Sequence, residues 1–575
     1  MINLKINNTP VSVPEGSTIL EAAETLGLKI PTLCHIKWDC FNTEHRCGSC
    51  RVCVVEVTGR PNLAPSCCTP VAEGMDVHTN TSRAIRARRT MLELLLSNHP
   101  KDCLVCSKNQ ECELQRLASA FNIHHIKYEG AQSEFPVDEN GAAIRRDMSK
   151  CIMCRRCETA CNVVQTVGVL SGVNRGFNAV VAPENFAQLT DTACTFCGQC
   201  VQACPVGALT EIGYKDEVWE QLNNPKKTVI VQTAPAVRVA IGEEFGFQAG
   251  EISTGKLVAA LRRIGFAKVF DTDWSADLTI MEESTELLER IKSGENLPLL
   301  TSCCPGWVNF LEHQFPDLLH MPSTAKSPQQ MFGAIAKSYY AEKIGIDPSD
   351  LIVVSIMPCL AKKYEASRPE FANDGVRDVD YVLSTRELAS MIKEAGIVFD
   401  RLPDEQYDNP LGESTGAAVI FGASGGVLEA ALRTVAGWLE GDKDSPIDFV
   451  AVRGLEGIKE ATVTIAGIEL KAAVASGLGN VRKLLERIQR GETQYHAIEV
   501  MACPGGCING GGQPYNHGNT AILEARKDAI YRADKGLPIR KSHLNPSIVK
   551  IYEEYLGKPN SEKAHKLLHT HYHAK

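Results

Sequence analysis

Two cysteines stand side by side in the stretch TSCCPGW, at Cys303 and Cys304. Adjacent side chains on an extended segment point to opposite faces, so one metal cluster cannot readily bind both. The 575-residue chain has 23 cysteines, and most precede residue 205. In a compartment that keeps thiols reduced, clustered cysteines indicate metal or iron–sulfur ligation rather than disulfides.

Two cysteine runs share one spacing. CIMCRRCETAC and CTFCGQCVQACP both follow C-x2-C-x2-C-x3-C, which is typical of a two-cluster ferredoxin domain. The fourth cysteine of each run then ligates the other cluster. One [4Fe–4S] cluster is expected on Cys151, Cys154, Cys157 and Cys204, and the second on Cys194, Cys197, Cys200 and Cys161.

A third group mixes histidine with cysteine. HPKDCLVCSKNQEC supplies His99, Cys103, Cys106 and Cys112, with no fourth cysteine near. A neutral imidazole can complete a [4Fe–4S] cluster, and a zinc site with the same ligands is the alternative.

The first 80 residues place two close cysteines between two distant ones. Cys34, Cys47, Cys50 and Cys67 resemble the ligands of a [2Fe–2S] ferredoxin domain. Cys53 and Cys68 are alternatives to Cys67, and Cys40 is expected not to be a ligand.

These ligands need elements that position them. MINLKINNTPVSV predicts a hairpin, and STILEAAETLGL predicts a helix capped by Ser17 or Thr18. From about residue 213, short apolar runs alternate with helical patterns, which predicts α/β architecture with largely parallel sheets. The runs are TVIVQT, AKVFD, LPLLTS, LIVVSIM, AAVIFG and HAIEVM. Later cysteines follow such runs, where open sheets bind ligands.

Composition excludes some classes. A formal net charge of -9 argues against a nucleic-acid binder. The sequence has no apolar run of about 18 residues, so no membrane span is expected. The start of the chain lacks the pattern of a secretory signal, so a cytoplasmic protein is expected.

Three segments resemble the signatures of [FeFe]-hydrogenases of the clostridial modular type: TSCCPGW, MPCLAKKYEA and EVMACPGGCINGGGQP. The resemblance favours Cys67 in the first domain. It implies that Cys304, Cys359, Cys503 and Cys507 hold a [4Fe–4S] cube. Cys507 would bridge the cube to a two-iron subsite carrying CO, cyanide and a dithiolate, which completes the H-cluster.

The resemblance also implies a lining for that subsite. Lys362 would bind a cyanide, because its charge and donors suit an anion. The other implied lining residues are Pro235, Pro328, Gln329, Met357, Phe421 and Met501. The chain departs from the clostridial pattern at Ala236, where serine often stands, and at Pro504, where histidine is common.

Cys303 is expected to exchange protons, because a thiol with a pKa of about 8.5 can do so near neutrality. Glu283, Glu286 and Arg290 fall on one face of a predicted helix, MEESTELLERI. With Ser323, the resemblance implies a proton path in the order Cys303, Glu283, Ser323, Glu286, Arg290. The alternative is a solvated helical face.

The expected protein is multidomain, α+β and α/β. The domains are a [2Fe–2S] ferredoxin-like β-grasp domain (1–80), a His/Cys3 [4Fe–4S] domain (81–126), a two-[4Fe–4S] ferredoxin domain (127–212) and an α/β H-cluster catalytic domain (213–575). The expected reaction is 2H⁺ + 2e⁻ ⇌ H₂, with one [2Fe–2S] and three accessory [4Fe–4S] clusters as the electron wire.

Ferredoxin or flavodoxin is the expected electron partner, and maturation proteins are needed for the subsite. The alternatives are the catalytic subunit of an NAD(P)-linked, electron-bifurcating complex, and an electron-transfer or sensory relative. Two further motifs have other interpretations. FGASGGVLEAA could cradle phosphate, although close approach to the buried cluster is preferred. HKLLHTHYHAK is expected to be a solvated tail rather than a metal site.

Overall fold

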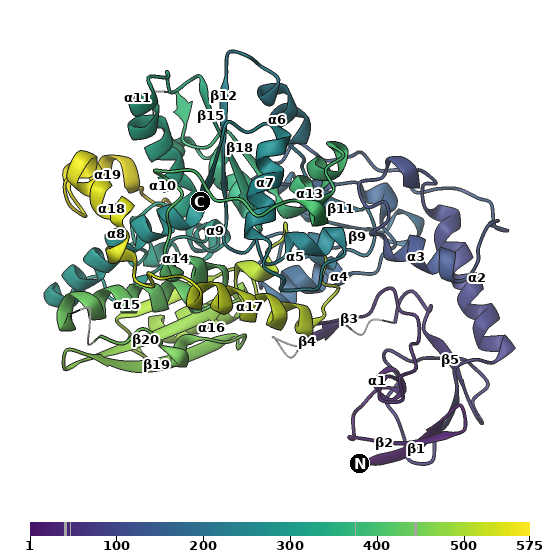
Figure 1. The fold of residues 1–575 in the computed structure, drawn as a ribbon. Helices are drawn as coiled ribbons and strands as arrows, with labels where there is room; N and C mark the ends of the chain where they lie inside the picture. The colour runs from purple at the N-terminus through teal and green to yellow at the C-terminus, as the bar shows by residue number, and fades with distance from the viewer. Residues whose placement is uncertain (39–42, 46–47, 374, 442–444) are drawn as a thin grey trace. The chain divides into compact units, whose positions relative to one another are not determined.

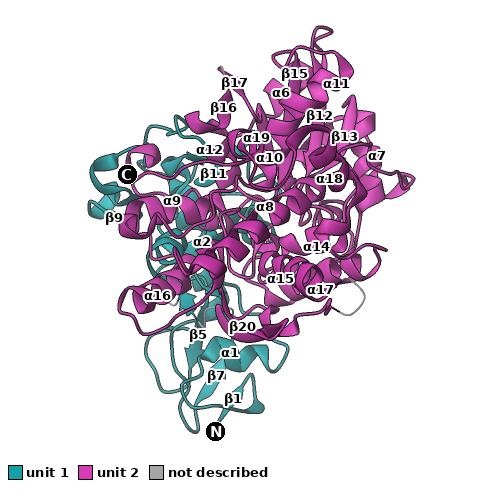
Figure 2. Cartoon of the chain, turned by 90° about the vertical axis from the view of Figure 1, so that its left-hand side faces the viewer, with its two compact units in different colours: residues 1–163, 169–188, 203–210 teal, residues 164–168, 189–202, 211–575 magenta. Residues whose placement is uncertain are grey.

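The computed structural model describes residues 1–38, 43–45, 48–373, 375–441 and 445–575. Figure 2 colours two compact units, which we describe separately. The first comprises residues 1–163, 169–188 and 203–210, and the second comprises 164–168, 189–202 and 211–575. Within the described residues, no helix combines the length and apolarity needed to cross a membrane.

The first unit begins with a five-stranded sheet of order β2-β1-β7-β5-β6. Its strands are β1 (Ile2–Ile6), β2 (Thr9–Val13), β5 (Val54–Val57), β6 (Ala64–Pro65) and β7 (Asp76–His78). The predicted hairpin is confirmed, because β1 pairs antiparallel with β2. The predicted helix is α1 (Ile19–Glu24), which Thr18 and Glu21 close with a reciprocal capping box.

Helix α2 (Ser82–Asn98) follows this sheet and is capped at its C-terminus by His99. Helix α3 (Glu113–Ala120) comes after the next three cysteines.

The two later cysteine runs share a backbone conformation. Met153 and Arg155 in one, and Phe196 and Gly198 in the other, have φ values between 52° and 74°. Left-handed residues at matched positions curl each run, so the repeated spacing is also a repeated shape.

The second unit contains two four-stranded sheets (Figure 1). One is fully parallel, with order β13-β12-β15-β18, from β12 (Thr228–Thr233), β13 (Lys268–Asp271), β15 (Leu351–Met357) and β18 (Tyr381–Ser384). The other has order β14-β21-β20-β19, from β14 (Leu299–Leu300), β19 (Ile458–Ile465), β20 (Ile468–Ser476) and β21 (Ala497–Met501). Only β19 runs antiparallel to its neighbour there. The predicted α/β architecture is confirmed.

One predicted strand is wrong. AAVIFG is helical, split between α14 (Gly416–Val419) and the 3₁₀ turn η13 (Ile420–Gly422). The whole segment is buried, so every side of it is apolar. Periodicity cannot distinguish a short buried helix from a buried strand in such a run.

Candidate functional site: a buried four-cysteine centre

The late cysteines all stand at the carboxyl ends of strands. Cys303 and Cys304 follow β14 and precede α9 (Pro305–Gln314), and Cys359 follows β15. Cys503 lies just beyond β21, and Cys507 begins the turn η15 (Cys507–Asn509). Because β14 and β21 are neighbours, their loops open at the same sheet edge.

The thiols of Cys304, Cys359, Cys503 and Cys507 are close enough to repel one another as thiolates. Burial, and then Cys304, raise the pKa of Cys359 to about 12. Burial, followed by Cys359 and Cys304, also raises the pKa values of Cys503 and Cys507. Four converging sulfurs, of which that of Cys503 is buried and the other three are half-buried, are a donor set that fits an iron–sulfur cube, whose positive irons would offset this repulsion.

Cys303 and Cys304 have partly different neighbours. The sulfur of Cys304 accepts a hydrogen bond from the Ala502 backbone N–H at 3.3 Å. Cys303 belongs to an apolar cluster that includes Ala236, Phe421 and Met501, and Cys304 and Cys507 pack against the same cluster. Cys303 thus packs with residues that are expected to line the two-iron subsite, while Cys304 raises the pKa values of the other three late cysteines.

A buried polar network borders Cys303. The Lys362 ammonium donates to the Cys303 carbonyl at 3.1 Å and to Glu365 Oε2 at 3.0 Å. Gln329 Nε2 also donates to Glu365, at 3.0 Å, while the buried Gln329 Oε1 has no hydrogen-bond partner among the described residues. An orphaned polar atom beside a buried cation fits a site shaped for a polar group. Glu365 was not predicted, although its i,i+3 spacing from Lys362 in the sequence indicates the pair.

Three further lining residues stand at element boundaries. Pro235 follows β12, Pro328 is the first residue of α10 (Pro328–Ile335), and Met357 ends β15. Met357 is buried in the larger apolar core. Their chemistry suits a wall that excludes water rather than one that binds ions.

The glycine-rich segment lies close to the loop between the last two cysteines, which was the interpretation preferred over a phosphate cradle. A methyl group added at Gly506 would lie 2.6 Å from the Ser424 amide nitrogen. The amides of Gly425 and Leu428 donate to the buried Glu499 carboxylate at 2.6 and 2.9 Å. Glu499 therefore occupies the anion position at the start of α15 (Gly426–Glu440), and the structure does not support a phosphate cradle there.

The second ferredoxin-type run docks on the same centre. Gly198 is so close to Gly511 that a methyl group on Gly198 would lie 2.9 Å from its Cα. Gln199 Nε2 donates to the Asn509 carbonyl at 3.0 Å. The thiol of Cys197 is also near enough to raise the pKa of Cys503, after burial and two of the other cysteines. The contact links the Cys194–Cys200 run to the four-cysteine centre.

In the first unit, the His99 imidazole has the tautomer and the protonation state that a metal ligand needs. Its Nδ1 is 2.9 Å from the Pro100 carbonyl, an arrangement that favours N–H on Nδ1 and a lone pair on Nε2. The Nε2 atom is buried and has no hydrogen-bond partner among the described residues. Burial lowers the pKa of His99, which favours the neutral form.

A cavity of about 340 Å³ brings His99 together with Cys50 and Cys151. Its other walls include Met91, Leu94 and Ile152. Residues expected to ligate three different clusters thus lie around one space, as an electron wire requires. Burial and Cys204 raise the pKa of Cys151 to about 11, which places Cys151 and Cys204 near each other. Cys161 belongs to the first unit and Cys194, Cys197 and Cys200 to the second, so that cluster stays a prediction.

Four cysteines of the first domain lie near one another in the structure: Cys34, Cys50, Cys53 and Cys67. Cys40 and Cys47 lie outside the described residues. Cys53 Sγ is 3.4 Å from Cys67 Sγ, and Cys34 interacts with Cys50 and Cys67. The buried Arg88 Nη2 has no hydrogen-bond partner among the described residues. Burial lowers the pKa of Arg88, and the nearby Cys53 opposes this shift. This environment of thiols and a spare donor fits a [2Fe–2S] cluster.

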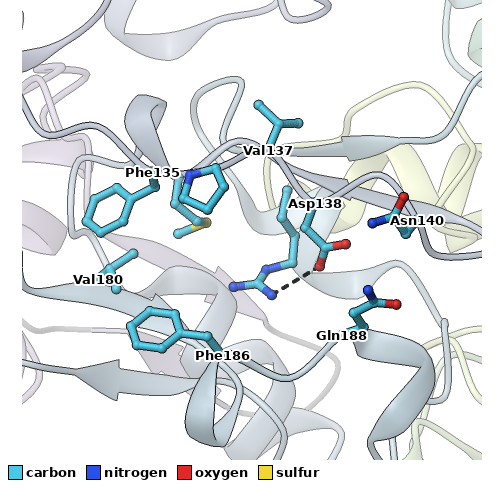
Figure 3. Close-up of a pocket in the computed structure, with 10 residues that line it drawn as sticks. Phe135, Val137, Asp138, Asn140, Val180, Phe186 and Gln188 are labelled. Atoms are coloured by element: carbon cyan, nitrogen blue, oxygen red, sulfur yellow. Dashed lines mark hydrogen bonds and ion pairs between the residues drawn. The ribbon is translucent and has the colours of Figure 1, made fainter.

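A second cavity in the first unit, of about 160 Å³, has a different lining (Figure 3). Phe135, Val180 and Phe186 surround it, and Arg146 pairs with Asp138 at 3.4 Å. It has no thiol or imidazole in its wall. Its donor set therefore does not fit an iron–sulfur cluster.

The acidic helix face is not fully solvated, because Glu283 is buried and Glu286 and Arg290 are half-buried. Helix α8 (Thr272–Ser293) presents Glu283, which is 2% exposed, to the Ser302 amide and hydroxyl at 3.4 and 3.3 Å. Glu286 accepts from the Ser323 hydroxyl at 2.7 Å and from Arg290 at 2.5 Å. Burial, opposed by the Ser302 amide and aided by Glu286, raises the pKa of Glu283 to about 8. Burial and then Glu283 raise the pKa of Cys303.

The predicted solvated tail is exposed at most positions, but its middle is buried. His569 and Thr570 are buried, and His569 Nε2 lies 3.0 Å from Glu282 Oε2. Lys575 pairs with the buried Glu312 at 2.7 Å. Composition suggested a solvated segment, but partners distant in sequence bind its polar groups.

Comparisons with known proteins agree with this centre. Residues 227–511 match the family described as iron only hydrogenase large subunit, C-terminal domain, and residues 520–575 match iron hydrogenase small subunit. Residues 1–82 match a 2Fe-2S iron-sulfur cluster binding domain. Residues 88–127 match the NADH-ubiquinone oxidoreductase-G iron-sulfur binding region, and residues 147–208 match a 4Fe-4S dicluster domain.

Whole-chain relatives extend the match. The NADP-reducing hydrogenase subunit HndD of Solidesulfovibrio fructosivorans is 59% identical, over 100% of this chain and 99% of its own. Iron hydrogenase 1 of Clostridium pasteurianum is 41% identical, over 100% of both. The solved apo [FeFe]-hydrogenase HydA1 from Chlamydomonas reinhardtii is 43% identical, with a TM-score of 0.57, over 63% of this chain and 99% of that one.

The fold and the buried cysteine centre thus define an oxidoreductase with iron–sulfur domains joined to an α/β catalytic domain. The chain belongs to the iron-only, or [FeFe], hydrogenases.

Proposed function

We propose that this hydrogenase interconverts protons and H₂ at an H-cluster whose [4Fe–4S] cube is held by Cys304, Cys359, Cys503 and Cys507. The convergence of these four thiols at the ends of three strands is the observation that carries the proposal. When bound, the cluster supplies the iron site at which 2H⁺ and 2e⁻ form H₂.

The chain's own residues would set the surroundings of that cluster. Lys362 would bind a cyanide, because its buried ammonium is already oriented by Glu365 and the Cys303 carbonyl. The predicted apolar wall would exclude water and lower the local dielectric. Its members are Pro235, Ala236, Pro328, Met357, Phe421 and Met501, with Gln329 as the polar member.

Four accessory clusters would carry electrons to this centre. For the [2Fe–2S] cluster we propose Cys34, Cys50, Cys53 and Cys67, since Cys53 lies against Cys67 and stands in C-x2-C spacing with Cys50. His99, Cys103, Cys106 and Cys112 would hold the next cluster. The two ferredoxin-type clusters would keep the ligands predicted from the repeated spacing, and the run with Cys197 contacts the catalytic centre.

Protons would pass from Cys303 through Glu283, Ser323 and Glu286 to Arg290. The support is geometric, because the Ser323, Glu286 and Arg290 side chains form continuous hydrogen bonds. Glu283 is buried, and Glu286 and Cys303 each interact electrostatically with it. Glu283 with a pKa of about 8 can both hold and release a proton near neutrality.

The proposed physiological setting is an NAD(P)-linked complex in the cytoplasm. A relative 59% identical over the whole chain is named as a subunit of an NADP-reducing hydrogenase. The glycine-rich segment, which was the candidate phosphate cradle, binds Glu499 instead. Nucleotide chemistry would therefore belong to partner subunits, with ferredoxin or flavodoxin as the alternative electron partner. Isolating the native protein and counting its subunits tests this choice.

Infrared spectroscopy tests the central proposal. Protein expressed with dedicated maturation proteins should show bands of iron-bound CO and cyanide and should evolve H₂. Protein expressed without them should contain accessory iron but lack those bands and H₂ activity. Full turnover from the second preparation, with no added subsite, would contradict the assignment.

A further inference from the structure

The C-terminal segment 568–575 is bonded along the loop that carries Ser323. The Lys326 amide donates to the Leu568 carbonyl at 2.7 Å, and the Thr570 amide donates to the Thr324 carbonyl at 2.8 Å. Ala325 and His569 form an antiparallel bridge between these bonds. The backbone of the loop is therefore fixed by residues some 245 positions later in the chain.

Tyr572 extends from this segment to both halves of the proposed proton path. Its hydroxyl donates to the Ser323 carbonyl at 2.9 Å, and it lies close enough to the Ser302 side chain for Ser302 to lower its pKa. Ser302 is the residue that contacts Glu283, and Ser323 is the residue that contacts Glu286. The Tyr572 phenol thus lies between the part of the proton path that contains Glu283 and the part that contains Glu286.

Burial and the neighbouring carboxylates keep the Tyr572 phenol neutral. Burial, and then the Glu283 and Glu286 carboxylates, raise the pKa of Tyr572, while Ser302 opposes the shift. A neutral phenol remains a hydrogen-bond donor across the working pH range. It can therefore hold an acceptor in place without changing its own charge.

We propose that Tyr572 is a positioning residue of the proton path. Its hydroxyl holds the Ser302 and Ser323 segments at a fixed spacing, so that Glu283 and Glu286 stay within reach of one another through Ser323. Proton transfer is steeply dependent on donor–acceptor distance, so a small shift of either serine slows each turnover. This inference rests on the proton path proposed above and adds a residue outside its five members.

The test replaces only the hydroxyl, in Tyr572→Phe, within the fully matured enzyme. Loss of one buried hydrogen-bonding group should lower H₂ turnover by roughly five- to tenfold and increase the solvent deuterium isotope effect. The CO and cyanide infrared bands should match the parent. Tyr555→Phe is the matched control, because Tyr555 packs on Tyr339 and Lys563 and should keep the parental rate.

Glu286→Gln separates the two proposals. If it cripples turnover while Tyr572→Phe keeps the parental rate and isotope effect, the role of Tyr572 is overturned and the path stands. If Glu286→Gln itself turns over at the parental rate, the path falls, and the role of Tyr572 falls with it. Loss of the infrared bands in Tyr572→Phe would also overturn the inference, since Tyr572 would then serve assembly of the site.

Discussion

Replacing Glu283 by glutamine should separate catalysis from stability. The change keeps the shape of the side chain and its acceptor for the Ser302 amide, but it removes the titrating carboxyl. We expect Glu283→Gln to lower H₂ turnover by about 100-fold or more, the usual contribution of a group that transfers protons. The same change should make the folded protein more stable at neutral pH.

The magnitude follows from the pKa of Glu283, which burial raises from its ordinary 4.5 to about 8. Below pH 4.5 the carboxyl is protonated in both the folded and the unfolded chain, so the two proteins should have the same stability on this account. As pH rises from 4.5 to about 8 the parent loses stability, because the unfolded chain releases this proton first. At pH 7 the difference spans 2.5 units, or about 3 kcal/mol at 1.36 kcal/mol per unit.

Thermal midpoints of matured parent and variant, measured anaerobically from pH 5 to pH 8, test the stability claim. The variant's advantage should grow with pH and reach roughly 4 °C at pH 7. Asp277→Asn is the control for activity, because Asp277 is a buried carboxylate on the same helix that bonds to Thr415 and Asn545 instead. It should retain turnover. Parental turnover in Glu283→Gln, with its infrared bands intact, would refute the proposed path.

Three more outcomes are expected. Cys303→Ser should keep all clusters yet lose most H₂ turnover, and Cys303→Asp, which restores a titrating group, should retain more; a serine variant at the parental rate would make Cys303 a packed thiol. His99→Ala should slow electron exchange with the natural partner more than with methyl viologen, which can reduce other clusters; equal rates with the natural partner would argue against that cluster. Gly506→Ala, at φ 98° and with its methyl 2.6 Å from the Ser424 amide nitrogen, should reduce occupancy of the catalytic cluster, read as weaker CO and cyanide bands; an unchanged spectrum would show that the loop can shift.

The sequence alone was sufficient where chemistry depends on local spacing. The spacing of the two C-x2-C-x2-C-x3-C runs predicted a ferredoxin-type pair, and each run has the same curled backbone in the structure. The face formed by Glu283, Glu286 and Arg290 also follows from helical periodicity, because residues three and four apart are neighbours on one helix.

Only the tertiary structure decided which distant groups meet. The sequence left Cys53 as an alternative to Cys67, and only the fold brings the two sulfurs within 3.4 Å of each other. It did not indicate that Glu499 would bind the amides of the glycine-rich segment. It predicted a solvated C-terminal segment, yet Tyr572 bonds to the loop of Ser323. These contacts join residues with large sequence separations, so no local pattern encodes them. The helical AAVIFG segment failed for a related reason: burial on every side removes the periodicity that distinguishes helix from strand.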